Sequence, residues 1–129
     1  MTDDFQVNAG AAFDYQLIMN MSDDKAVPEC LKSTTGLDNT TVSNMKKGVN
    51  LTKSNVISAC LGIHIPFRVS SRMLQLAETP IDLTLPGKKG EENGVYDQIL
   101  HLNWAQDYSD TYDELKVDHY EHLIHQPPI

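Results

Sequence analysis

A short run of small polar residues between positions 38 and 47 carries groups that can bind a polar partner. The outward residues of this run are Asn39, Thr40, Thr41, Ser43, Asn44, Lys46 and Lys47. Amide and hydroxyl groups can donate and accept hydrogen bonds at base edges, and lysines can neutralise phosphates. The pattern therefore favours a surface that reads nucleic acid, although a solvated polar helix face has a similar composition.

Two short helices must position these groups. The first is predicted over about 27–34, with Pro28 in its first turn and Gly36 as a left-handed stop. Asp38 or Asn39 is predicted to cap the second helix, which Gly48 ends. The backbone N–H groups at the amino end of this second helix are predicted to donate hydrogen bonds to a phosphate.

The apolar spacing around this pair predicts three more helices. They span 11–21, then 52–61, where Thr52 is the cap and Gly62 the stop, and finally 69–77. Inward residues are predicted at Leu37, Val42, Met45, Val56, Ile57, Cys60, Leu61, Val69, Met73 and Leu74. No segment of this region is typical of a strand, so the fold class is all-α, a compact five-helix bundle.

The rest of the chain completes the predicted organisation. The segments are a flexible N-terminus at 1–10, a helical domain at 11–78, a linker at 79–94 and a C-terminal helical extension at 95–129. Prolines and glycines mark the linker. One helix is predicted from Val95 to about Trp104, and another from a cap at Ser109 or Asp110 through Leu115 and His119 to Leu123.

Charge is distributed unevenly along the chain, which has a net charge of -8. Between Lys25 and Arg72, seven basic residues and two acidic residues give +5, whereas three basic and sixteen acidic residues elsewhere give -13. Such asymmetry indicates a nucleic-acid face beside an acidic appendage, or acidic ends that only maintain solubility. No apolar run is long enough to span a membrane, and no secretory signal begins the chain, so a cytoplasmic location is expected.

The two cysteines and three closely spaced histidines are candidate reactive or metal-binding groups. Cys30 and Cys60 are predicted to be reduced, small apolar fillers, with an exposed redox pair as the alternative. His119, His122 and His125 recur every three residues, but the fixed ligand spacing of zinc sites is missing. They are predicted to be exposed histidines of an amphipathic tail, and no metal and no cofactor are expected. The chain also lacks a nucleophile elbow and a phosphate-binding loop, so no enzyme activity is expected.

Residues 27–76 resemble the lambda-repressor-like (Cro-type, XRE-type) helix-turn-helix family. The matching elements are Pro28-Glu29 at a helix start, Thr35-Gly36-Leu37 as the turn, Thr41-Val42-Ser43 in the recognition helix, and the glycine after Lys46-Lys47. The stretch 55–78 is similar to a subgroup of bacterial and mobile-element regulators. Members of that subgroup continue into two further helices and a proline-bearing tail, as residues 96–129 do.

The resemblance implies a sequence-specific DNA-binding transcriptional regulator, a repressor or autoregulator, that binds double-stranded DNA as a homodimer. Residues 38–47 would be the recognition helix. Base contacts are then expected from Asn39, Thr40, Thr41, Ser43 and Asn44, and phosphate contacts from Lys32, Lys46, Lys47 and Lys53. Trp104, Tyr108, Tyr112 and Tyr120 would either anchor the dimer or complete the core of one chain.

The chain departs from the family pattern at two places. Family members favour a small residue where this chain has Lys32, so either Cys30 or Leu31 points inward or the paired helices pack less closely. The recognition helix also lacks arginine, the residue that most often contacts guanine. Readout of A·T-rich sites through Asn39 or Asn44 is then expected, or DNA binding has been lost. The alternative function is an acidic adaptor, antitoxin or inhibitor that binds a basic protein partner through the C-terminal region.

Overall fold

The computed structural model describes residues 26–49 and 51–128 and is all-helical over these residues. The elements are α2 (Ala26–Thr35), α3 (Asn39–Lys47), α4 (Lys53–Gly62), α5 (Phe67–Leu76), α6 (Gly87–Leu102), α7 (Tyr108–Val117) and the 3-10 helix η1 (Glu121–Leu123). The predicted flexible N-terminus at 1–10 and the predicted helix at 11–21 lie outside the described residues. In the described part, no helix is long and apolar enough to cross a membrane.

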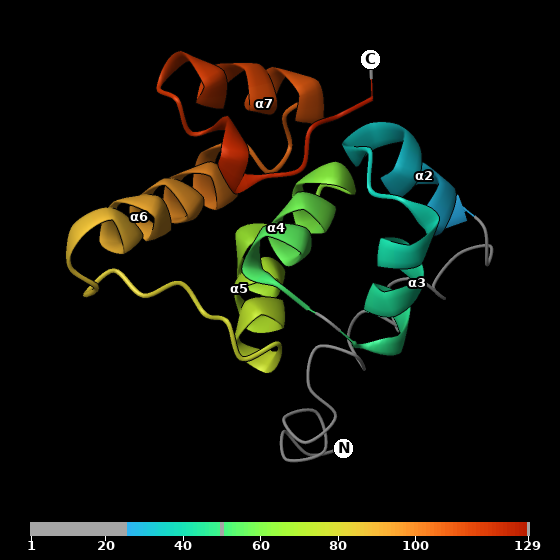
Figure 1. The fold of residues 1–129 in the computed structure, drawn as a ribbon, viewed down its shortest axis with the longest axis horizontal. Helices are drawn as coiled ribbons and strands as arrows, with labels where there is room; N and C mark the ends of the chain where they lie inside the picture. The colour runs from blue at the N-terminus through green and yellow to red at the C-terminus, as the bar shows by residue number, and fades with distance from the viewer. Residues whose placement is uncertain (1–25, 50, 129) are drawn as a thin grey trace.

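Helices α4 and α5 lie in the middle of the fold. The pair α2 and α3 lies on one side of them and α6 on the other, while α7 packs against α2 (Figure 1). One hydrophobic core joins both sides, because Leu31 of α2, Val56 of α4, Leu100 of α6 and Ile124 after η1 belong to the same buried cluster. The predicted C-terminal extension therefore packs into the core that the central helices form.

The turn between α2 and α3 follows the local signals in the sequence. Gly36 adopts a left-handed φ of 79°, and Asp38 is the N-cap of α3, where its side chain accepts a hydrogen bond from the Thr41 amide at 2.7 Å. Leu37, between them, is buried. Gly48 ends α3 with a φ of 76°. These predictions are confirmed because each depends on residues only a few positions apart.

Helix α4 begins at the predicted cap but ends differently. Thr52 accepts a hydrogen bond from the Asn55 amide at 3.1 Å, as predicted. Gly62, however, is the last residue of the helix, and the left-handed residue is His64 with a φ of 58°. Gly62 is buried against Thr35, whose methyl group would collide with a Cβ at this position. The glycine therefore permits close packing of α2 on α4.

Helix α5 begins at Phe67, two positions before the predicted start at Val69, directly after Pro66. The earlier start changes which residues face the core. Met73 and Leu74 are buried as predicted, but Val69 is 45% exposed, so the prediction that it points inward is wrong. Pro66 precedes the first helical residue, where a missing N–H costs nothing and φ near -60° already suits a helix.

Helix α6 begins at Gly87, within the segment predicted as a linker. The three glycines of its first half do not prevent the helix, because two of them have geometric roles. Gly87 has a left-handed φ of 67°, and a Cβ at Gly90 would collide with the carbonyl oxygen of Leu85. Asn93 is buried and links the helix to the preceding loop by accepting the Asp82 amide at 3.0 Å.

Helix α7 ends at Val117, so the prediction that it continues through His119 to Leu123 is wrong. His119 has a positive φ of 64°, which turns the chain back after the helix. Two buried tyrosines then hold the returning segment. The Tyr96 hydroxyl donates to the Leu123 carbonyl at 2.6 Å, and the Tyr108 hydroxyl donates to the His125 carbonyl at 2.6 Å.

The Tyr96 contact predicts a dependence of stability on alkaline pH. Burial, with the nearby charge of Glu92, raises the pKa of Tyr96 to about 12 from an ordinary value of 10.0. The unfolded chain therefore ionises first, and the stabilisation that is present below pH 10.0 is lost as pH rises towards about 12. Urea unfolding of Tyr96→Phe should show a shallower loss of stability over this range than the parent. At neutral pH this variant should lose about 1 kcal/mol. Tyr108 is present in both chains and cannot cause a difference between them. An identical dependence of the free energy of unfolding on alkaline pH in the two chains would therefore contradict the prediction.

Candidate nucleic-acid interface

Helix α3 presents most of the predicted base-contacting residues to solvent. Asn39, Thr40 and Ser43 are exposed, and Thr41 and Asn44 are half-buried. The opposite face of the helix is buried through Val42 and Met45. This arrangement follows from helical periodicity, because residues three apart share a face. The predicted set is thus brought together on one helix.

Two predicted site residues contact one another directly. The Lys32 ammonium group donates to the Asn39 side-chain oxygen at 2.7 Å, and it forms an ion pair with Glu29 at 3.1 Å. Lys32 therefore joins α2 to the first turn of α3, and Leu31 beside it is the residue that points inward. The Asn39 oxygen has a second lone pair and its NH2 group can still donate, so Lys32 orients this side chain for a base contact.

A carboxylate lies at the amino end of α3. Asp38 accepts a hydrogen bond from the Thr41 N–H, and this bond is the main cause that lowers the pKa of Asp38. A hydrogen bond with the Thr41 side chain lowers the pKa further. The charged carboxylate already stabilises the amino end of the helix and would repel a phosphate there. The prediction that this end accepts a phosphate is therefore not supported by its geometry.

The predicted phosphate-contacting lysines occupy different environments. Lys47 is exposed at the end of α3, and the Lys46 side chain lies outside the described part of the structure. Lys53, by contrast, donates to the Asn93 side-chain oxygen of α6 at 2.8 Å, and partial burial lowers its pKa. Arg68 is exposed on α5. The structure thus places Lys32 and Lys47 on the α2–α3 pair and directs Lys53 towards α6.

The C-terminal tail contacts the α2–α3 turn, which the sequence patterns did not indicate. The His125 N–H donates to the Ser58 hydroxyl oxygen of α4 at 2.9 Å, and His125 Nδ1 lies 3.0 Å from the Thr35 carbonyl oxygen. Because a carbonyl only accepts, Nδ1 must carry the proton in this contact. The Gln126 carbonyl lies against Gly36, so the tail braces the turn that orients α3.

The three histidines of the tail diverge. His122 Nε2 lies 3.0 Å from a Glu92 carboxylate oxygen, whereas His125 lies at the α2–α3 turn. Over the described residues, no three side chains of His, Cys, Asp or Glu gather where they can hold a metal ion. The predicted amphipathic tail is also not helical beyond η1, and it is extended where it meets the turn.

The cysteines and aromatic residues divide between core and surface. Cys60 is buried, which raises the pKa of its thiol to about 12, but Cys30 is exposed, so the prediction that both are apolar fillers is wrong for Cys30. Cys30 lies off the inward face of α2, which Leu31 and Thr35 occupy. Tyr108 completes the core of the single chain, while Trp104, Tyr112 and Tyr120 are half-buried.

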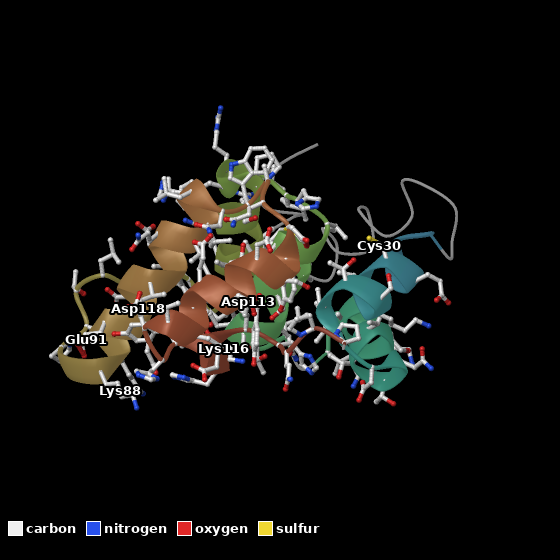
Figure 2. All side chains as sticks on the ribbon, turned by 90° about the horizontal axis from the view of Figure 1, so that it is seen from above. Cys30, Lys88, Glu91, Asp113, Lys116 and Asp118 are labelled. Carbon is white, nitrogen blue, oxygen red and sulfur yellow. The ribbon has the colours of Figure 1, made fainter. Side chains whose placement is uncertain are left out.

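Acidic residues collect on α7. Figure 2 shows Asp113 and Lys116 on this helix, Asp118 at its C-terminal end, and Cys30 at α2 on the other side of the molecule. Asp107, Asp110 and Glu114 are also exposed. These exposed acids thus gather on α7, which packs against α2.

No protein-family model, curated protein or solved structure matches the chain.

Proposed function

We propose that the protein is a sequence-specific DNA-binding transcriptional regulator with α3 as its recognition helix, in a lambda-repressor-like helix-turn-helix arrangement. The observation that carries this proposal is the division of α3 into two faces. Val42 and Met45 fix the helix to the core, and the outward face offers Asn39, Thr40 and Ser43. These short amide and hydroxyl side chains suit base edges and phosphates in the major groove.

Charge separation supports the same orientation towards DNA. Lys32 and Lys47 lie on the α2–α3 pair, and the exposed acids lie on α7, which packs against α2. Helix α3 itself contains no acidic residue, so it adds no charge that would repel the DNA backbone. Lys53 donates a hydrogen bond to Asn93 of α6, so it is not among the proposed phosphate contacts.

A homodimer is part of the proposal. Helix-turn-helix modules bind two half-sites whose recognition helices are about 34 Å apart. The half-buried Trp104, Tyr112 and Tyr120 offer aromatic surface for a partner chain on the α6–α7 side. Sedimentation with and without DNA measures this association.

Substitution of three exposed residues of α3 tests the proposal. Thr40→Ala, Ser43→Ala and Lys47→Ala together should weaken binding to a duplex selected by the parent chain by about tenfold to hundredfold. Loss of Lys47 should also reduce the slope of log affinity against log salt concentration by about one per subunit. Alanine suits helices, so the fold should be retained.

The matched control is Asp113→Ala with Lys116→Ala, a pair exposed on α7. This variant should bind the duplex as the parent does. If the α3 variant binds the duplex with the same affinity as the parent, α3 does not contact the DNA.

The second candidate function is binding of a basic protein partner through α7. The exposed Asp107, Asp110 and Asp113 favour it, because a dense set of acids steers basic surfaces. If the chain retains no duplex but binds a basic protein, the α7 control pair should change that binding and the α3 variant should not.

A further inference from the structure

Lys32 reaches from the last turn of α2 to the first residue of α3. Its ammonium group donates to the Asn39 side-chain oxygen at 2.7 Å and pairs with a Glu29 carboxylate oxygen at 3.1 Å. The Lys32 side chain is 29% exposed, and a phosphate contact would require it to leave both partners. A charge-assisted hydrogen bond is among the stronger ones in proteins, so this contact holds the Asn39 side chain in one orientation.

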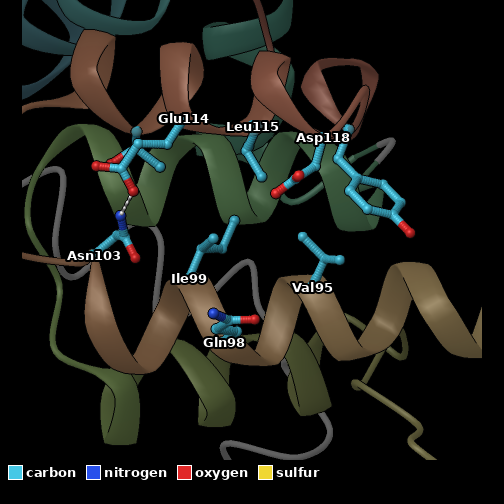
Figure 3. Close-up of a pocket in the computed structure, with 9 residues that line it drawn as sticks. Val95, Gln98, Ile99, Asn103, Glu114, Leu115 and Asp118 are labelled. Carbon is cyan, nitrogen blue, oxygen red and sulfur yellow. Dashed lines mark hydrogen bonds between the residues drawn. The ribbon is translucent and has the colours of Figure 1, made fainter.

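The sign of the neighbouring charge sets the orientation of an asparagine side chain. At the cavity between α6 and α7, the Asn103 NH2 group donates to the negative Glu114 carboxylate at 3.2 Å (Figure 3). At Asn39 the neighbour is the positive Lys32, so the oxygen is directed inward and the NH2 group is left for a partner outside the chain. The two contacts orient their amides in opposite senses.

The outward side of Asn39 is therefore a hydrogen-bond donor. A second lone pair remains on its oxygen, but an N–H group brought to that lone pair meets the positive charge of Lys32 and is repelled. The neighbouring Asp38 carboxylate is directed to the Thr41 amide. Asn39 is exposed, and the N-terminal residues of a recognition helix are those that contact base edges.

The four bases differ in what they offer to a donor. In the major groove, guanine presents two acceptors, N7 and O6, adenine and thymine present one each, and cytosine presents a donor. An unconstrained asparagine reads adenine, because its oxygen accepts from the adenine NH2 group while its own NH2 group donates to N7. Beside Lys32 the adenine NH2 group would meet a positive charge. A side chain that only donates matches guanine best.

We propose that Asn39, oriented by Lys32, reads a guanine in each half-site. The pair then supplies the guanine contact that α3, which contains no arginine, otherwise lacks. This inference rests on the proposed recognition of DNA by α3. Lys32 is a positioning residue, because it acts through Asn39, and it is not the phosphate contact that the sequence predicted.

Selection from a randomised duplex library with the parent and three variants tests the proposal. The parent should enrich a guanine at one position of each half-site, and Asn39→Ala should lose about tenfold of the preference at that position alone. Lys32→Met retains an unbranched side chain with good helix propensity but removes the donor. This variant should change the preference at the same position from guanine to adenine, by about tenfold. Lys32→Arg retains a donor and should keep guanine.

The salt dependence of binding separates positioning from phosphate contact. Lys32→Met should leave the slope of log affinity against log salt concentration unchanged. Lys47→Ala is the matched control, because Lys47 is exposed at the end of α3. It should reduce the slope by about one per subunit and leave every base preference unchanged. If Lys32→Met instead reduces the slope and leaves the base preferences of the parent, Lys32 contacts phosphate and the proposal fails.

The selection also distinguishes failure of this inference from failure of DNA recognition. A parent site that carries adenine at the position sensitive to Asn39→Ala, or a site that no Asn39 variant changes, overturns the guanine contact and leaves α3 as the recognition helix. A library without any enrichment overturns both proposals.

Discussion

Gly36→Ala is expected to lower the free energy of unfolding by about 2–5 kcal/mol. One part, about 1–2 kcal/mol, arises because alanine is strained at the left-handed φ of 79°. The remainder, about 1–3 kcal/mol, arises because the added Cβ would collide with the backbone carbonyl of Gln126 and displace the tail. Urea unfolding followed by circular dichroism measures the sum.

Gly87→Ala provides the matched control for that experiment. Gly87 also has a left-handed φ, of 67°, but a Cβ there meets nothing within 4 Å. This variant should therefore show only the conformational part, about 1–2 kcal/mol. Equal losses in the two variants would contradict the contact between the tail and the α2–α3 turn.

Removal of residues 124–129 is expected to destabilise the fold by about 2.5–6 kcal/mol. The truncation removes the buried side chain of Ile124, worth about 1.5–3 kcal/mol. It also removes the hydrogen bonds of the Tyr108 and Ser58 hydroxyls with His125, and each bond contributes about 0.5–1.5 kcal/mol. The free energy of unfolding of a native protein is only about 5–15 kcal/mol in total. Thermal unfolding of the truncated chain should therefore begin near room temperature.

A shorter truncation distinguishes the packed tail from chain length alone. Removal of residues 128–129 keeps Ile124, His125 and Gln126, and Pro128 is exposed. The stability of this chain should match that of the parent within about 0.5 kcal/mol. If the longer truncation also melts like the parent, the tail does not support the fold.

The central helices could be predicted because their signals are local. Gly36, Asp38, Gly48 and Thr52 each determine a turn or a cap within a few residues, and all four occupy the predicted roles, since short-range sterics and hydrogen bonds decide them. The outward face of α3 follows from the same periodicity. The grouping of its polar residues was thus predictable, whereas their function stays a prediction.

Contacts between distant parts of the chain could not be predicted. His125 bonds to Ser58 across 67 positions and to Thr35 across 90, and no local pattern encodes either. Lys53 likewise meets Asn93 across 40 positions, which removes it from the expected phosphate set. The start of α6 was not predicted because glycines indicate a loop, whereas Gly90 is required in the helix by the close approach of the Leu85 carbonyl.

Selection from a randomised duplex library, at low and at physiological salt, tests the central claim most directly. The account predicts an enriched, roughly palindromic site with two half-sites one helical turn apart, and retention that falls steeply with salt. Sedimentation of the same sample should then show a dimer on the selected duplex. No enrichment, with no retention even at low salt, would contradict DNA recognition by α3.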